Sequence, residues 1–218
     1  MNRKDQAEEF IENSRHAIQH LFDALSEYNR VLEQAQTTVE EIERSKNVLS
    51  DLFMYRDQWS PNANHHYAQY VRRMEELEKQ KAEAQENDTD KLEKALFNIG
   101  ATVESMSGLA GAVLQIGKQA LSIRHGGKPS LPTARTVGTQ NIVEVVWEGR
   151  NHAMHWDEGA PRERVQNMLD ALATDLNITI EVGKNNCLSI LGALEWKTPE
   201  NVISDNQIKG PLVIGALS

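Results

Sequence analysis

The chain has 218 residues, of which 39% are hydrophobic, 6% aromatic and 25% charged, and its formal net charge is −9. This length suits one domain, or one domain with an elongated arm. The acidic balance argues against unselective binding of nucleic acid. The apolar runs look too short to span a bilayer, and the first ten residues do not resemble a signal peptide, so we expect a cytoplasmic protein that binds no membrane.

Apolar residues recur every seven positions over the first 55 residues of the chain. One register comprises Ile11, Ile18, Leu25, Leu32, Val39 and Phe53, and the other comprises Leu21, Tyr28, Ala35, Ile42 and Leu49. Such a seam predicts a long helix that packs lengthwise against a partner, as in a coiled coil. We expect a kink at Thr37 and Thr38, and the run Ser-Pro-Asn-Ala-Asn at 60–64 predicts the end of this helix.

Two further helices are predicted before residue 125. One covers about 65–86, and the next begins at Asp88, because Asp-Thr-Asp at 88–90 is typical of a helix N-cap. The third helix has a seam offset by one residue from that of the second, so we expect a break or a stutter near Asn87. This seam comprises Leu92, Leu96, Ile99, Val103, Met106, Ala110, Val113, Gly117 and Ala120. The run His-Gly-Gly-Lys-Pro at 125–129 predicts its end.

The second half of the chain predicts shorter elements. Helices are expected at about 139–156, 161–176 and 185–194, with a last short helix from residue 198 and a short strand at 178–182. The tail from residue 208 is expected to be poorly ordered or to pack on a partner. The fold class is therefore an all-α helical bundle with long antiparallel, coiled-coil-like N-terminal helices. We divide it into heptad-patterned helices at 1–124 and a motif helix with C-terminal helices at 134–206. Cys187 is expected to be a small core residue.

The basic residues are distributed unevenly. No Asp or Glu occurs between Glu104 and Glu144, whereas this segment holds four cations that we take as candidate RNA-binding residues: Lys118, Arg124, Lys128 and Arg135. The segment leads directly into the run Arg-Asn-His-Ala-Met-His at 150–155. An alternative is that the missing acids only complement the negative end of a helix dipole.

The candidate catalytic residues are Arg150, Asn151 and His155, with His152 as possible support. On a helix, Asn151 and His155 share a face, whereas Arg150 lies about 140° around the axis and would have to fold back along the surface. A histidine can move the proton of a 2′-hydroxyl or of a leaving 5′-oxygen, and a guanidinium can stabilise the charge on a phosphate. These groups suit cleavage of RNA without a metal. The second proton-transfer group would come from His152 or from a second copy of the chain.

The sequence WEGRNHAMHWDEG at 147–159 resembles the signature of HEPN domains, in which an Arg and a polar residue precede a His after four to six intervening positions. The residues that match are Arg150, Asn151 and His155. Such domains are helical bundles that dimerise so that two motifs face one cleft, and many are metal-independent endoribonucleases in toxin–antitoxin, abortive-infection and CRISPR-associated defence. The resemblance implies a homodimer that needs no cofactor, an RNA substrate, and a cognate antitoxin or defence partner. The long heptad arm, the expected strand and the acidic charge depart from the family pattern.

Three other interpretations of the motif remain open. Its basic residues could serve only to pair with Glu148, Asp157 or Glu158 at a helix end. His152 and His155 could ligate zinc together with Asp157 or Glu158, although only two nitrogen ligands are local. Finally, the chain could be a catalytically inactive scaffold that docks a partner through its heptad helices.

Overall fold

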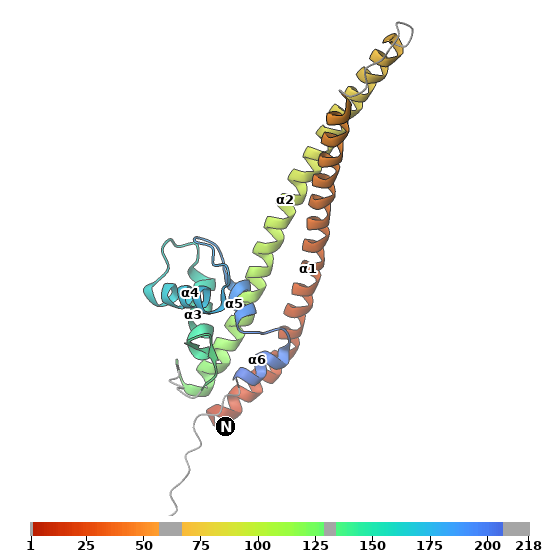
Figure 1. Ribbon diagram of the computed structural model, residues 1–218. Helices are drawn as coiled ribbons and strands as arrows, with labels where there is room; N and C mark the ends of the chain where they lie inside the picture. The colour runs from red at the N-terminus through yellow and green to blue at the C-terminus, as the bar shows by residue number, and fades with distance from the viewer. Residues whose placement is uncertain (1, 57–66, 129–133, 207–218) are drawn as a thin grey trace, which may run out of the picture. The chain divides into compact units, whose positions relative to one another are not determined.

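The computed structural model describes residues 2–56, 67–128 and 134–206, and it is 79% helical. Figure 1 shows the six helices and one small hairpin. In chain order they are α1 (Arg3–Arg56), α2 (Tyr67–His125), β1 (Thr136–Val137), β2 (Gln140–Asn141), α3 (Ile142–His155), α4 (Glu163–Leu176), α5 (Cys187–Ala193) and α6 (Pro199–Asn206). The predicted all-α class is confirmed, and so is the packing of the two long helices against each other. The predicted loop at 60–64 and the tail from 208 lie outside the described residues.

Both long helices are continuous at the places where a kink (Thr37 and Thr38) and a break (Asn87) were expected. In α1, the hydroxyls of Thr37 and Thr38 donate to the carbonyls of Glu33 and Gln34, so the helix absorbs both residues without ending. The predicted break near Asn87 is wrong, because α2 runs through it. Asn, Asp and Thr each cost only about 0.7 kcal/mol or less inside a helix. The Glu, Lys, Ala and Leu residues on either side are good helix formers and outweigh that cost.

The contacts divide the chain into two compact units. Unit 1 comprises Met1–Tyr28 and Glu104–Ser218, and unit 2 comprises Asn29–Val103. Both boundaries therefore fall within the long helices rather than in the loop after α2, where the sequence suggested a division. All the candidate site residues lie in unit 1.

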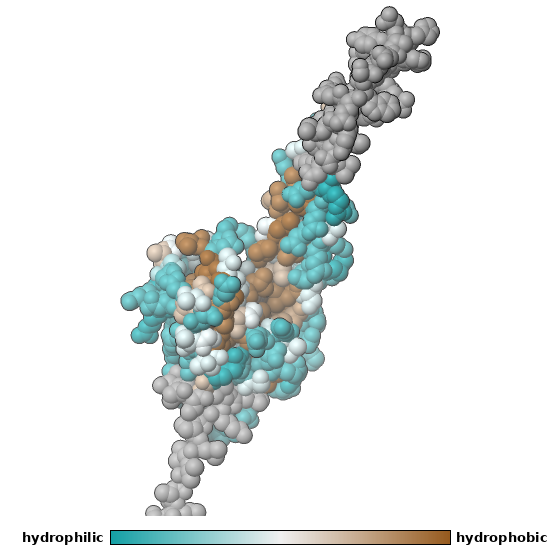
Figure 2. All heavy atoms as spheres, viewed as in Figure 1, coloured by the Kyte–Doolittle hydropathy of each residue, from teal (hydrophilic) through white to brown (hydrophobic). Residues whose placement is uncertain are grey.

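In unit 2, the predicted seam of α2 is confirmed at Leu92 and Ile99, which are partly buried, but its other two positions lie one residue away from the buried ones. Ala95 and Thr102, seven residues apart, are buried, whereas Leu96 and Val103 are 53% and 38% exposed. Phe97 is 76% exposed. Apolar residues occupy two neighbouring faces of this helix, so the period alone did not identify the face that packs inward. The brown apolar surface along α2 in Figure 2 is consistent with this exposure.

Unit 1 contains the main core. Its fully buried side chains include Ile18 of α1, Val113 and Leu114 of α2, Val145 and Val146 of α3, Leu172 of α4, Ile190 of α5 and Val202 of α6. Ion pairs join the helices at the edge of this core. Arg15 Nη1 lies 2.9 Å from Glu200 Oε1, which links α1 to α6. Every helix of the unit therefore contributes to one apolar interior, and α3 is held within it.

One described segment, Glu86–His125, is long and apolar enough to cross a membrane by length and composition. This finding differs from the expectation that no such run exists. The core helix of a soluble protein passes the same test, and Val113 and Leu114 of this segment are fully buried in unit 1.

The C-terminal half confirms the predicted helices but not the predicted strand. Residues 178–182 form a loop, and Val182 is 97% exposed. Asn186 holds this loop: its Oδ1 accepts from the Glu181 N–H at 2.9 Å, and its Nδ2 donates to the Glu181 and Lys184 carbonyls. The segment has the alternation of a strand but no neighbouring strand to pair with. Cys187 is buried, and this burial raises the pKa of its thiol to about 12, so its assignment as a core residue is confirmed.

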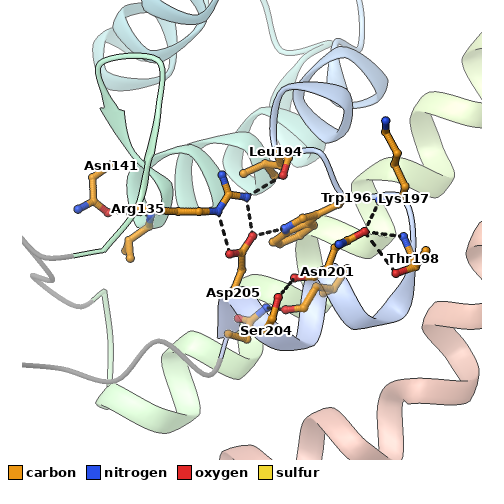
Figure 3. Close-up of polar contacts among 12 residues, drawn as sticks. Arg135, Asn141, Leu194, Trp196, Lys197, Thr198, Asn201, Ser204 and Asp205 are labelled. Carbon is orange, nitrogen blue, oxygen red and sulfur yellow. Dashed lines mark hydrogen bonds and ion pairs between the residues drawn. The ribbon is translucent and has the colours of Figure 1, made fainter.

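A partly buried polar cluster fastens α6 to the rest of unit 1 (Figure 3). Asp205 Oδ1 and Oδ2 accept hydrogen bonds from Nε and Nη2 of Arg135 at 2.8 and 2.6 Å. Trp196 Nε1 donates to Asp205 Oδ2 at 2.7 Å, and Arg135 Nη2 also donates to the Leu194 carbonyl. One carboxylate therefore connects the segment before the hairpin, the α5–α6 loop and α6. We call these four residues the Asp205 cluster.

The indole of Trp196 fills the space beside Gly117 of α2, and this contact gives a prediction. A Cβ on Gly117 would lie 2.6 Å from Trp196 Cη2, whereas a Cβ on Gly108 of the same helix would meet nothing within 4 Å. Gly108→Ala should therefore stabilise unit 1 by about 0.5–1 kcal/mol through helix propensity. Gly117→Ala should instead destabilise it by about 1–2 kcal/mol, because the Asp205 cluster prevents the indole from moving away. Urea unfolding of the two variants should show opposite signs, and two stabilised variants would contradict this packing.

Candidate functional site

Helix α3 carries the whole motif and is fixed at both ends. At its start, Asn141 Oδ1 accepts from the Val143 N–H at 2.9 Å and forms the N-cap. At its end, the chain turns through Gly159 towards α4. Between the two helices lies a recess of about 140 Å³. It is lined by Asn151, His152, His155, Glu158, Ala160, Pro161, Arg162 and Val165. The recess therefore holds Asn151, His152 and His155, but Arg150 is not among its lining residues.

His155 is the accessible histidine of the recess. Its side chain is 40% exposed, and its Nδ1 lies 2.7 Å from Glu158 Oε1. The neutral ring therefore carries its proton on Nδ1 and leaves Nε2 able to exchange a proton with a ligand. A carboxylate that fixes the tautomer in this way is a common partner of histidines that transfer protons. The pairing with Glu158 was anticipated only as a non-catalytic alternative, and the geometry serves either role.

Asn151 is held by a buried carboxylate. Its Nδ2 donates to Glu148 Oε2 at 2.9 Å, and Lys128 Nζ lies 2.7 Å from Glu148 Oε1 and 2.8 Å from Glu144 Oε2. Glu148 itself is buried. The hydrogen bond from Asn151 and the ion pair with Lys128 offset the free-energy cost of removing its carboxylate from water. The Glu148 side chain therefore determines the orientation of the Asn151 amide. The spacing of three residues between Glu148 and Asn151 was the available sequence signal for this contact.

His152 is a structural residue of the core. It is buried, and its Nε2 accepts a hydrogen bond from the backbone N–H of Asn186 at 3.0 Å. A backbone N–H can only donate, so Nε2 must be unprotonated and the imidazole neutral. Burial lowers the pKa of His152, and a hydrogen bond with the Lys184 backbone opposes that shift in part. The ring anchors the 181–186 loop and has no nitrogen free for a substrate proton.

The lowered pKa of His152 predicts that acid destabilises unit 1. The unfolded chain binds a proton at the ordinary histidine value of about 6.5, and the folded chain binds it only at lower pH, so stability falls as the pH drops through and below 6.5. His125, whose pKa burial also lowers, acts in the same direction. His152→Gln should therefore reduce the slope of unfolding free energy against pH between 7 and 5 by up to about 1.4 kcal/mol per unit. An unchanged slope, measured by urea unfolding, would contradict a neutral His152 in the fold.

Arg150 points away from the recess and towards α2. Its Nε donates to Gln115 Oε1 at 2.5 Å. It also lies close enough to Lys118 for its charge to lower the pKa of that amine, although burial of Lys118 is the larger cause. The Lys118 ammonium in turn lies 4.7 Å from the centre of the Trp147 ring. Within one chain, the Arg150 guanidinium therefore does not fold back to His155. The separation of about 140° around the helix axis had left this possibility open.

The other three candidate RNA-binding cations are paired inside the fold. Arg124 Nη1 lies 4.0 Å from Glu8 Oε1, Lys128 contacts Glu144 and Glu148, and Arg135 is bound by Asp205. The segment without acids is therefore neutralised by carboxylates from elsewhere in the sequence. Lys118 is the one of the four with no carboxylate partner among the described residues.

The geometry does not bring the expected zinc ligands together. His152 lines the recess, but its Nε2 is occupied by the Asn186 N–H, which leaves His155 and Glu158 from the proposed ligand set. Among the described residues, no group of three or more His, Cys, Asp and Glu side chains is arranged to hold a metal ion.

Two recess residues were missed as functional candidates in the sequence. Glu158 was considered only as a helix-end or zinc partner, and Arg162 was not considered, because both lie in the loop after the motif helix. The Gly-Ala-Pro run at 159–161 is the signal that the chain turns back there. The recess thus combines an accessible imidazole, a carboxylate, an amide and a guanidinium, which are groups able to bind a phosphate ester and move a proton. No protein family, curated protein or solved structure matches the chain.

Proposed function

We propose that this protein is a cytoplasmic, HEPN-type, metal-independent endoribonuclease, and that His155 is its proton-transfer residue. The observation that carries the proposal is the contact of 2.7 Å between His155 Nδ1 and Glu158 Oε1 in a recess that also holds Asn151 and Arg162. The motif at 150–155 supports it through its resemblance to the family. The reaction requires no redox group and no metal, because the nucleophile belongs to the RNA itself.

The proposed reaction is an internal transesterification. The 2′-oxygen attacks the adjacent phosphorus, the bond from phosphorus to the 5′-oxygen breaks, and a 2′,3′-cyclic phosphate and a 5′-hydroxyl result. One proton leaves the 2′-hydroxyl, and one proton must reach the departing 5′-oxygen. His155 Nε2 performs one of these transfers. Arg162 stabilises the charge that develops on the phosphate oxygens, and Asn151, oriented by Glu148, donates to the phosphate or the ribose.

A homodimer supplies the second proton-transfer group in this proposal. His152 cannot do so, because its Nε2 is buried against the Asn186 N–H. His155 is then the only described histidine of the motif that can exchange a proton with a substrate. Two recesses that face one another across a twofold axis would provide one imidazole as base and one as acid. We place the protein in bacterial toxin–antitoxin or antiviral defence, where a partner protein would restrain such an activity.

The test is cleavage of RNA by the purified protein in the presence of EDTA. A 5′-labelled RNA should yield fragments that end in a 2′,3′-cyclic phosphate, whereas the same sequence with 2′-O-methyl riboses should remain intact. Products with a 3′-hydroxyl, or cleavage of the methylated RNA, would contradict the mechanism. A complete lack of cleavage of any RNA by a correctly folded dimer would contradict the function.

A second candidate function is that of an inactive interaction protein. The observation that favours it is the exposed apolar surface of unit 2, where Leu96, Phe97 and Val103 of α2 face solvent. Exposed apolar residues clustered on one helix commonly mark a protein interface. Phe97→Asp should abolish co-purification of a partner, such as a cognate antitoxin or defence subunit, under this alternative. Under the nuclease proposal, the same variant retains full RNA cleavage.

A further inference from the structure

Four side chains on the facing surfaces of α2 and α3 form a second polar site in unit 1. Gln115 and Lys118 are one helical turn apart on α2, and Trp147 and Arg150 are one turn apart on α3. The two pairs are cross-linked: Arg150 Nε donates to Gln115 Oε1, and Lys118 Nζ lies over the Trp147 ring at 4.7 Å. All four are partly exposed, so solvent and ligands can reach them. We call these residues the α2–α3 cationic site.

The site keeps two positive charges together without a counterion. Neither Lys118 nor Arg150 pairs with a carboxylate anywhere in the described parts of the chain. Arg124, Lys128 and Arg135 in the same unit each have one. The proximity has a cost, since burial and the charge of Arg150 together lower the pKa of Lys118. An anion bound between the two cations would remove this repulsion.

The neutral partners arrange the two cations for such an anion. Gln115 holds Arg150 through Nε alone, which leaves the two terminal NH₂ groups of the guanidinium available as a fork. Trp147 holds Lys118 through its π-face, which fixes the position of the ammonium and leaves its N–H donors unpaired. Neither partner carries a negative charge that would compete with a ligand. A fork beside a point charge matches the oxygens of a phosphodiester.

We propose that the α2–α3 cationic site binds a backbone phosphate of the RNA substrate, with Arg150 and Lys118 as its ligands. This inference rests on the proposed function, and it assigns the motif arginine to substrate binding rather than to the recess of His155. The same chemistry would also suit free phosphate or the phosphate of a nucleotide. These sources differ in salt dependence, because only a polyanion releases a condensed layer of counterions when it binds.

The experiment measures binding of a 2′-O-methyl RNA of about twelve nucleotides, which cannot be cleaved, by fluorescence anisotropy at several salt concentrations. Lys118→Met should weaken binding by on the order of threefold to tenfold and lower the salt slope by up to about 0.7, the value for one single-strand phosphate contact, since Arg150 still contacts that phosphate. Lys197→Met, which removes one exposed cation from the α5–α6 loop, is the matched control and should change neither quantity. Wild-type affinity and slope in Lys118→Met would overturn the proposal.

A second pair of measurements separates this site from a structural role and from the nuclease proposal. Thermal unfolding of Lys118→Met should occur at or above the wild-type temperature, since the substitution removes a like-charge contact, and a variant that binds less RNA because it is partly unfolded would melt earlier. The double variant Lys118→Met, Arg150→Met should lose less binding free energy than the sum of the losses in the two single variants, because both residues hold one phosphate. Additive effects would overturn the shared site.

If wild type binds the methylated RNA with this pattern but cleaves no RNA, only the nuclease proposal fails. If Lys118→Met loses affinity for inorganic phosphate but binds the methylated RNA as tightly as the wild type does, the site takes free phosphate and its assignment to the RNA backbone is overturned.

Discussion

His155→Ala is expected to lower the rate of RNA cleavage in EDTA by on the order of 10²–10⁴-fold, the usual contribution of a positioned acid–base group. The substitution removes the imidazole that faces the recess, whereas the side chain is 40% exposed and contributes little to the core. The unfolding free energy should therefore change by less than about 0.5 kcal/mol. The rate is measured as initial velocity with a labelled RNA, and the fold is checked by urea unfolding of the same preparation.

Two further variants make the result specific to the proposed site. His20→Ala removes an exposed histidine from α1 and should leave the rate unchanged. Glu158→Gln keeps a hydrogen-bond acceptor for Nδ1 but removes the charge that stabilises the imidazolium, so the maximal rate should fall by about tenfold with little change in KM. EDTA-resistant cleavage by His155→Ala at the wild-type rate would show that another residue transfers the proton. In that case His155 is only the helix-end partner of Glu158.

Helix α3 presents two chemically different faces, one with His155 and the other with Arg150. His155 and Asn151 face the recess beside α4, whereas Trp147 and Arg150 face α2. A spacing of five residues cannot place two side chains on the same helix face. In the proposed enzyme, one face moves the proton and the other holds the strand. A second copy of the chain is then needed to complete the pair of imidazoles, but not to supply an arginine to its own recess.

The sequence predicted those elements whose signals are local. The run His-Gly-Gly-Lys-Pro at 125–129 is such a signal, and α2 ends at His125 as it predicted. The errors were of a different kind. The N-cap pattern at 88–90 and the alternation at 178–182 were real local signals, but packing over the length of α2 and the lack of a pairing strand overrode them.

The candidate site was predicted in part for the same reason. Periodicity placed Asn151 and His155 on one face, and the structure brings them into one recess. The periodicity of the sequence could not show that His152 is buried against Asn186, because that contact joins residues 34 apart in sequence. Nor could it show the counterions of the cationic segment: the carboxylate of Asp205 lies 70 residues after Arg135. Charge counted along the chain therefore overstated how many cations are available to RNA.

The Asp205 cluster is expected to be the most costly polar group to remove from unit 1. Asp205→Ala leaves the buried indole N–H of Trp196 without its acceptor and the guanidinium of Arg135 without its carboxylate. Loss of one partner from a fully buried charge pair typically costs about 3–5 kcal/mol. Because Arg135 is exposed and can regain water, we expect a smaller cost of about 2–3 kcal/mol, which comes mainly from the unpaired indole N–H. Asp205→Asn keeps one acceptor oxygen and should cost about half as much.

Urea unfolding measures this effect as a shift of the midpoint at constant slope. Glu9→Ala, which removes an exposed carboxylate from α1, is the control and should change the unfolding free energy by less than about 0.5 kcal/mol. The Gly117→Ala variant provides a further check, since the indole is free to move once Asp205 is gone. In the Asp205→Ala background, the added methyl group at 117 should therefore cost less than in the wild type. If the two costs simply add, the carboxylate does not hold Trp196 against α2.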